Sequence, residues 1–364
     1  MATTPVRVES ERVLGFLARI AAGEASPDSL LAACGVWVDR YAAMLELLRA
    51  AGVAIKPSSA GVRAVGAPRP DGPPTAYLHH DIHVRDISGA ACMASAERAL
   101  GIASHYSLLF EMSGAETLAR DDFLALRPII GDAHHVGLHG APVDRALGAE
   151  FCDGDGRDCR ERIAKHLFKR LDGAMSKNEI ARARLLPEVE GEGADSFGER
   201  RFVADLFPSA RPVIEKSFSV LKKDQAAFED LFGGGEVYTA HGGGVVRYAA
   251  DQRNAADGSR EQAIWNLIAY LGQAQYLAKF ENFGLPREIN QLRRDIDYGY
   301  LSDNSPRHFW PGFSRRVADG VDFILLIHPY QWQAGRIGDD LSMRDGSRHD
   351  EASNGPEQRV QPLR

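Results

Sequence analysis

Short apolar runs that end in histidine recur through this chain of 364 residues, and they constrain its fold more than any other feature. These runs, which have the length of buried strands, are residues 75–83, 134–140, 236–244 and 321–332. The segments between them that show helical spacing are residues 88–101, 157–174, 224–233 and 261–280. Strands that alternate with helices predict an α/β fold with a mostly parallel sheet, either open or closed into a barrel.

The last residues of the four apolar runs share a chemistry. They are His79, His80, Asp81, His83, His139, His241 and His328. Since functional groups gather at the carboxyl ends of parallel strands, we expect these side chains to converge on one face. Imidazole nitrogens and carboxylate oxygens suit Zn²⁺ or a similar divalent ion. Packing alone would favour Val or Ile at such positions, so the pattern predicts a metal or acid–base site.

Several of these segments also resemble a known family. Residues 77–110, which contain His80-Asp81-Ile82-His83, resemble the opening of polysaccharide-deacetylase-like proteins of the NodB-homology type. In one branch of that family the first strand ends in a His-Asp-x-Asp motif. The segments that resemble later elements of the family, in the same order, are HHVGLHGAPVD (134–144), YTAHGGG (238–244), YLSDNSPRHFW (300–310) and LLIHPYQW (325–332).

The resemblance implies a distorted (β/α) barrel and a divalent metal ion, with Zn²⁺ expected, whose bound water attacks an N-acetyl carbonyl. Asp81 matches the carboxylate of the first motif and His139 matches the histidine of the second. His328 matches the closing histidine, a candidate general acid for the leaving amine. We therefore expect a metal-dependent hydrolase of a C–N amide bond that de-N-acetylates an amino sugar or a related small conjugate.

Three departures from the family leave the metal ligands open. His80 stands where a second Asp usually precedes the motif carboxylate, His83 replaces the branch's other Asp, and Val143 stands where a second His is usual. The expected ligands are Asp81, His83 and His139, with His241 in reserve. If the first-motif carboxylate is a ligand, the role of general base falls to Asp303 or Asp144.

Three residues are candidate substrate contacts. His80 could touch substrate, or His79 and His80 could both orient the loop through hydrogen bonds behind the ligands. Gly242 would let the backbone approach a ligand closely beside His241. Trp332 could line a sugar-binding cleft, although packing of the closing strand competes with that interpretation. Two further histidines near the strands, His105 and His134, are interpreted as structural.

Composition predicts four parts of the chain. Residues 1–56 are expected to be an N-terminal helical appendage, and the Pro-, Gly- and Ser-rich residues 57–74 a linker. Residues 75–334 are expected to form the deacetylase-like barrel domain. Residues 335–364 contain almost no apolar side chains and are expected to be a disordered tail.

The N-terminus is polar and no run of about 18 apolar residues occurs, so we expect no secretory signal, no membrane association and a cytoplasmic location. Free thiols are therefore expected for the four cysteines, which lack CxxC spacing: Cys34, Cys92, Cys152 and Cys159. The net charge of −7 and the isoelectric point near 6.0 argue against nucleic acid as a partner.

A small N-acetylated sugar or sugar conjugate is the expected partner, and a homo-oligomer is left open. A competing hypothesis is a non-catalytic barrel of the same type that binds a glycan or a protein partner. Another hydrolytic reaction, such as cleavage of a phosphoester, is disfavoured because no Arg or Lys cluster near the motifs could clamp a phosphate.

Overall fold

The computed structural model describes residues 4–61, 72–83, 86–109, 120–131, 133–140, 142–151, 156–186, 203–233, 237–240, 245–255, 259–271, 287–288, 300–304 and 306–337. The strands are β1 (Ala54–Pro57), β2 (Thr75–Ile82), β3 (His105–Leu109), β4 (His135–Gly140), β5 (Val237–Ala240), β6 (Arg287–Glu288), β7 (Tyr300–Ser302) and β8 (Phe323–Ile327). Predicted strands at 75–83, 134–140, 236–244 and 321–332 therefore correspond to β2, β4, β5 and β8.

Helices occupy the segments between the strands. The first half of the chain contains α1 (Thr4–Ala21), η1 (Pro27–Ala33), α2 (Trp37–Ala50), α3 (Ser58–Gly61), α4 (Ile87–Ala99), α5 (Arg120–Ile130), α6 (Pro142–Phe151) and α7 (Gly156–Ala174). The second half contains α8 (Lys177–Arg184), α11 (Val203–Leu206), η3 (Pro208–Ala210), α12 (Arg211–Phe232), α13 (Val245–Ala255), α14 (Arg260–Leu271), α16 (Pro306–Asp319) and α17 (Pro329–Gln333). None of the helices within these ranges is long and apolar enough to cross a membrane.

The strands form one sheet in the order β6-β5-β4-β3-β2-β8-β7, with every pair parallel, and β1 pairs with the first half of β2. This order follows the chain from β2 to β6, while β7 and β8 return to the other side of β2. Within the described ranges, β6 and β7 are therefore the two edge strands of the sheet. An α/β fold with a parallel sheet is confirmed.

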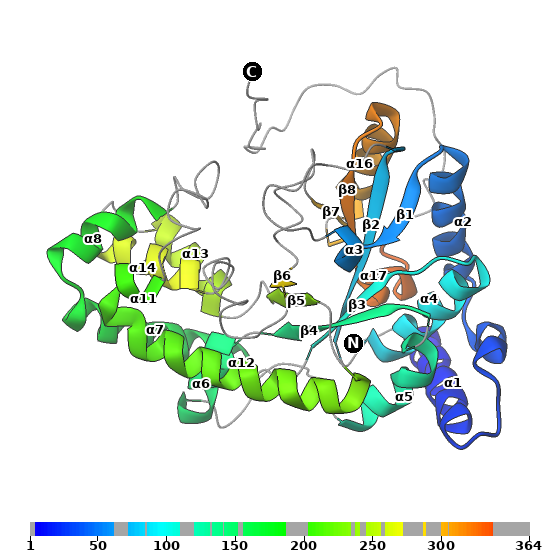
Figure 1. Ribbon diagram of the computed structural model, residues 1–364, viewed down its shortest axis with the longest axis horizontal. Helices are drawn as coiled ribbons and strands as arrows, with labels where there is room; N and C mark the ends of the chain where they lie inside the picture. The colour runs from blue at the N-terminus through cyan, green and yellow to red at the C-terminus, as the bar shows by residue number, and fades with distance from the viewer. Residues whose placement is uncertain are drawn as a thin grey trace.

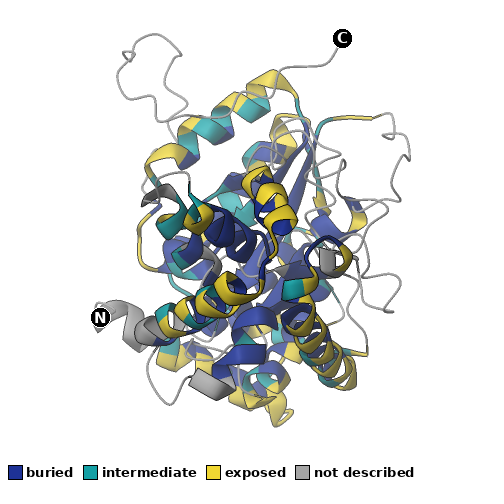
Figure 2. Ribbon diagram, turned by 90° about the vertical axis from the view of Figure 1, so that its left-hand side faces the viewer, coloured by how far each residue is buried: buried dark blue, intermediate teal, exposed yellow. Residues whose placement is uncertain are grey.

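Helices cover the sheet, so the strands are apolar runs rather than alternating ones. Every residue of β2 is buried, and Figure 2 shows buried strands behind helices whose outer faces are exposed. In Figure 1, α1, α2 and α4 lie beside one end of the sheet, while α7, α8, α13 and α14 gather beyond the other. These last four helices contact one another and derive from the connections that flank β5.

Helix α4 is buried around nearly its whole circumference, since residues 87–97 all lie in the interior. A helix in that position needs small side chains, and its sequence ISGAACMASAERA supplies them. A methyl group added at Gly89 would lie 2.7 Å from Cβ of Pro329 in α17. Helix α4 is therefore packed between the sheet and the N-terminal helices.

The N-terminal segment is part of this packing. Helices α1 and α2 and the 3-10 helix η1 all contact α4, and their apolar residues belong to the same hydrophobic core as the sheet. Residues 54–57 form β1, a strand that the prediction of a helical appendage over residues 1–56 did not include. The pattern AIKP is too short for its strand character to show without knowledge of its pairing with β2.

A disulfide joins this segment to α4. Cys34 and Cys92, with Cα atoms 5.8 Å apart, are bonded across 58 positions of sequence, and Cys159 is disulfide-bonded as well. The prediction of free thiols is therefore wrong for these cysteines. It rested on spacing and on the predicted compartment, whereas the packing of η1 on α4 brings the first pair together. Cys152, the linker residues 62–71 and the tail residues 338–364 lie outside the described ranges.

Candidate functional site

The alternation of side chains along β2 separates its neighbouring histidines onto two faces of the sheet. His79 and Asp81 pair in register with His105 and Ser107 of β3, whereas His80 pairs with Tyr106. His79, Asp81, His105 and Ser107 therefore share one face. The sequence placed His80 with Asp81 at a single site, but the strand directs the two side chains apart.

Asp81 lies at the centre of the first face. Its Oδ1 accepts a hydrogen bond from His79 Nε2 at 3.0 Å. Its Oδ2 lies 3.9 Å from His139 Nε2 and 3.8 Å from His328 Nε2. Burial alone would raise the pKa of the Asp81 carboxyl, but the surrounding imidazoles, His139 foremost, hold it well below its usual range. Asp81 is therefore an ionised carboxylate surrounded by imidazoles from three strand ends.

His139 is held in one tautomer. Its Nδ1 donates to the backbone carbonyl of Thr239 at 3.0 Å, and Thr239 is its partner in the β4–β5 register. Burial lowers the pKa of His139 and thereby favours the neutral imidazole, against the opposing effect of Asp81. With its proton on Nδ1, the lone pair of Nε2 faces Asp81, which is the arrangement that a metal-ligating histidine requires.

His328 and Asp303 form a buried pair at the end of β8. His328 Nδ1 donates to Asp303 Oδ1 at 2.7 Å, and its backbone N–H donates to Oδ2 at 2.8 Å. The indole N–H of Trp332 donates to the same Oδ2 at 3.1 Å. Burial raises the pKa of Asp303, whereas for His328 the Asp303 carboxylate overcomes burial and raises the pKa.

These bonds revise two predicted roles. Asp303 was a candidate general base, but its two oxygens accept three hydrogen bonds from His328 and Trp332, so it orients His328 instead. Trp332 was a candidate substrate contact, but it is buried and its polar atom is directed to Asp303. Asp303 thus fixes the imidazole of His328 through its hydrogen bond to Nδ1, and Trp332 fixes Asp303.

Asn304 completes the surroundings of His328 and was not recognised in the sequence. Its Nδ2 lies 3.1 Å from His328 Nε2. Its Oδ1 accepts hydrogen bonds from the Tyr330 hydroxyl and from Gln331 Nε2, both at 3.2 Å, which fixes the orientation of the amide. Asn304 therefore donates to Nε2, so this nitrogen is an acceptor. Its position directly after Asp303 was the one available signal.

His80 belongs to a second network on the opposite face of β2. His80 Nε2 lies 2.7 Å from Glu97 Oε1, and the hydroxyl of Tyr41 also bonds to that oxygen. The other oxygen of Glu97 accepts from Tyr106 at 2.9 Å and from Ser104. Burial alone would raise the pKa of Glu97, but His80 foremost among its partners lowers it to about 2. These contacts do not support the prediction that His80 touches substrate.

The other predicted residues lie around the strand ends or outside the described ranges. The ring of His83 is parallel to that of His139, with centroids 5.9 Å apart. Asp144 Oδ1 accepts from the backbone N–H of Val245 at the start of α13. His241 and Gly242 fall in the undescribed residues 241–244. Within the described ranges, no group of three or more His, Cys, Asp or Glu side chains is arranged to hold a metal ion.

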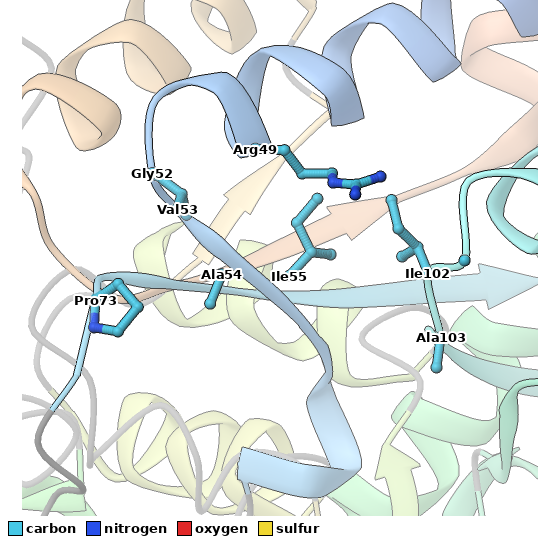
Figure 3. A pocket seen from close by; sticks show the side chains of 9 residues that line it. Arg49, Gly52, Val53, Ala54, Ile55, Pro73, Ile102 and Ala103 are labelled. Carbon is cyan, nitrogen blue, oxygen red and sulfur yellow. The ribbon is translucent and has the colours of Figure 1, made fainter.

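A shallow pocket lies away from this site. Its volume is about 400 Å³, and its lining comes from the start of β1 and from residues that precede β1, β2 and β3, including Val53, Pro73 and Ala103. Arg49 extends across it above Ile55 (Figure 3). Because it lies at the amino ends of the strands, it is separate from the histidines at their carboxyl ends.

Comparison of the chain with protein-family models, with curated proteins and with solved structures gives no match.

Proposed function

We propose that this protein is a metal-dependent hydrolase of C–N amide bonds that removes the acetyl group from an N-acetylated amino sugar or a related small conjugate. The observation that carries the proposal is the convergence of side chains from three strand ends, with Asp81 Oδ2 lying 3.9 Å from His139 Nε2 and 3.8 Å from His328 Nε2. Carboxylate oxygen and imidazole nitrogen are donors that Zn²⁺ takes, and a cation held at this point would be attracted by the charge of the Asp81 carboxylate. The resemblance to the NodB-homology family supports a barrel of that type as the setting.

Asp81 and His139 supply two donors of the types that a divalent ion such as Zn²⁺ takes, and they fall one or two short of a complete shell within the described ranges. Two ligands of a tetrahedral ion at ~2.0–2.2 Å lie roughly 3.3–3.6 Å apart, so the two acceptors would need to approach each other only slightly. His83 and His241 are the residues we propose to complete the shell. A metal-ligating histidine usually donates its other ring N–H to a carbonyl or carboxylate that orients it, and the hydrogen bond from His139 Nδ1 to the Thr239 carbonyl is of this kind.

When bound, the ion would act as a Lewis acid that polarises the amide carbonyl and acidifies the attacking water. His328 performs the proton transfers in this proposal. Its Nε2 is an acceptor in the resting state, because Asn304 donates to it, and Asp303 stabilises the imidazolium once the proton arrives. The same Nε2–H then protonates the leaving amine. His328 thereby replaces Asp303 and Asp144 as the base.

A direct test measures metal content and acetate release from N-acetylated amino sugars. The wild type should contain about one divalent ion per chain, and removal of that ion should abolish turnover. His139→Ala should lose the metal, while His308→Ala, a substitution at an exposed position of α16, should retain it. A wild type that binds no metal and is indifferent to chelator would overturn the proposal and favour a non-catalytic barrel that binds a glycan or a protein.

A cytoplasmic location and a small-molecule partner are part of the proposal. The Cys34–Cys92 disulfide weighs against the location, because cytosolic thiols are usually kept reduced.

A further inference from the structure

A chain of hydrogen bonds extends from the N-terminal segment to the central carboxylate. Ser58 Oγ lies 2.7 Å from His79 Nδ1, and His79 Nε2 lies 3.0 Å from Asp81 Oδ1. Ser58 and His79 are completely buried. The function proposed above assigns no role to either residue.

The fold explains why Ser58 reaches this position. It is the first residue of α3, directly after β1, and Pro57 at the end of β1 pairs in register with Leu78. Ser58 thus lies beside His79, the next residue of β2. The segment that composition marked as an appendage and a linker supplies one member of the site.

The protons in this chain can be placed. A carboxylate oxygen only accepts, so the hydrogen between His79 and Asp81 belongs to Nε2 of the imidazole. In the neutral ring Nδ1 is then an acceptor, and the hydroxyl of Ser58 donates to it. On its other side the His79 ring stacks on His105, with centroids 5.0 Å apart and planes inclined by 18°. The imidazole is therefore fixed in tautomer and in orientation.

The same three residue types form the nucleophilic triad of many hydrolases, but this arrangement does not serve that chemistry. The hydroxyl of Ser58 has no exposed surface through which a substrate carbonyl could reach it. Its hydrogen bond also points toward the carboxylate, so the chain acts on Asp81 rather than on Ser58.

We propose that Ser58 and His79 are positioning residues that hold Asp81 Oδ1, so that Oδ2 is presented to His139 and to the metal ion. This inference rests on the proposed metal site and adds to it the residues that orient its carboxylate. An unsupported carboxylate could rotate about its terminal torsion and turn Oδ2 away from His139. Support of this kind is commonly worth about 10- to 100-fold in metal affinity.

The test measures binding of Co²⁺ to the full-length protein, by chelator competition and by the visible absorption of the bound ion. His79→Leu and Ser58→Ala should each weaken Co²⁺ binding by about 10- to 100-fold and alter the absorption bands. His79→Gln, whose side-chain amide can donate to Asp81 Oδ1, should recover most of the affinity. The matched control is Ser59→Ala, because the neighbouring Ser59 is buried and its hydroxyl makes no hydrogen bond within the described ranges.

The outcomes separate the two proposals. If the wild type and both variants bind Co²⁺ equally well with the same spectrum, the positioning role is overturned and the metal site stands. If the wild type binds no Co²⁺, the metal site fails and the positioning role fails with it. Circular dichroism and thermal unfolding identify a variant that does not fold. In that event Ser58→Ala, which removes a single oxygen atom, decides the matter.

Discussion

The carboxylate of Asp303 accepts both the side-chain N–H and the backbone N–H of His328, at 2.7 and 2.8 Å. The two residues come from the ends of the neighbouring parallel strands β7 and β8, so the sheet itself brings them together. Because both are buried, the charge of Asp303 acts on the imidazole with little screening by solvent. The pair therefore controls whether His328 Nε2 can take and return a proton near neutral pH.

Replacing Asp303 by Asn should test this control. Asn can still accept the hydrogen bond from Nδ1 but lacks the charge that raises the pKa of His328, so that pKa should fall. Since His328 must be neutral to accept a proton, the acidic limb of the pH–rate profile should move to lower pH. The weaker base should also lower kcat by about 10²- to 10⁴-fold. Rates of acetate release across pH provide the measurement.

Asp319→Asn is the matched control, since its partner is Arg315 on the outside of α16. It should leave both the limb and kcat unchanged. An Asp303→Asn profile that superimposes on that of the wild type would remove His328 from the proton transfer. A shift confined to the alkaline limb would instead make His328 an acid only.

The disulfide between Cys34 and Cys92 should contribute to stability, because it restricts the unfolded chain over 58 positions. The double variant Cys34→Ser, Cys92→Ser should lose about 2–4 kcal/mol in free energy of unfolding, measured by urea titration without reductant. Reductant alone cannot isolate this effect, since Cys159 is also disulfide-bonded.

Alkylation of cell extracts followed by mass spectrometry should find the pair oxidised; a fully alkylated pair would contradict the disulfide and agree with a cytoplasmic location.

Glu97 should make the free energy of unfolding depend on pH in the acidic range. Its pKa lies at about 2 in the folded protein, below its ordinary value of 4.5, so the stabilisation is complete above the ordinary value and is lost as pH falls toward 2. Glu97→Gln should cost on the order of 3 kcal/mol at pH 7 and abolish the loss of stability within that window. Urea titrations at several pH values measure both effects. Glu161→Gln, in an exposed pair with Lys165, should cost less than about 1 kcal/mol.

Much of the site could be predicted because parallel strands carry their last residues to a common edge. Asp81 and His139 lie near the ends of β2 and β4, and His328 follows β8; both imidazoles come within 4 Å of Asp81 Oδ2. The two faces of β2 could not be told apart in the same way. The period of two in a strand puts His79 and Asp81 on one face and His80 on the other, but a strand buried on both sides shows no polar alternation that would indicate which face carries the site.

The missed residues have a common cause, since each depends on contacts between segments distant in sequence. Ser58 reaches His79 only because β1 pairs with β2, and β1 is a strand of four residues. Glu97 lies in an Ala-rich helix, and its partners come from α2, β2 and β3. Local periodicity carries no information about such pairings, whereas it does predict long elements such as α7 and α14.

Helix α4 packs against α17, so a larger side chain on α4 should displace α17 and with it the orientation of Asp303. In Gly89→Ala the new methyl group would meet Pro329 Cβ at 2.7 Å, at the start of the helix whose Trp332 donates to Asp303. The variant should lose about 1–3 kcal/mol of stability and shift the pH–rate limb of His328 in the direction of Asp303→Asn. Gly15→Ala, at an exposed position of α1 with no atom within 4 Å of the new methyl, should instead gain about 0.5–1 kcal/mol. Thermal unfolding and pH profiles of the two alanine variants measure both effects. A Gly89→Ala protein as stable as the wild type would show that α17 can move to accept the methyl group, which contradicts the prediction.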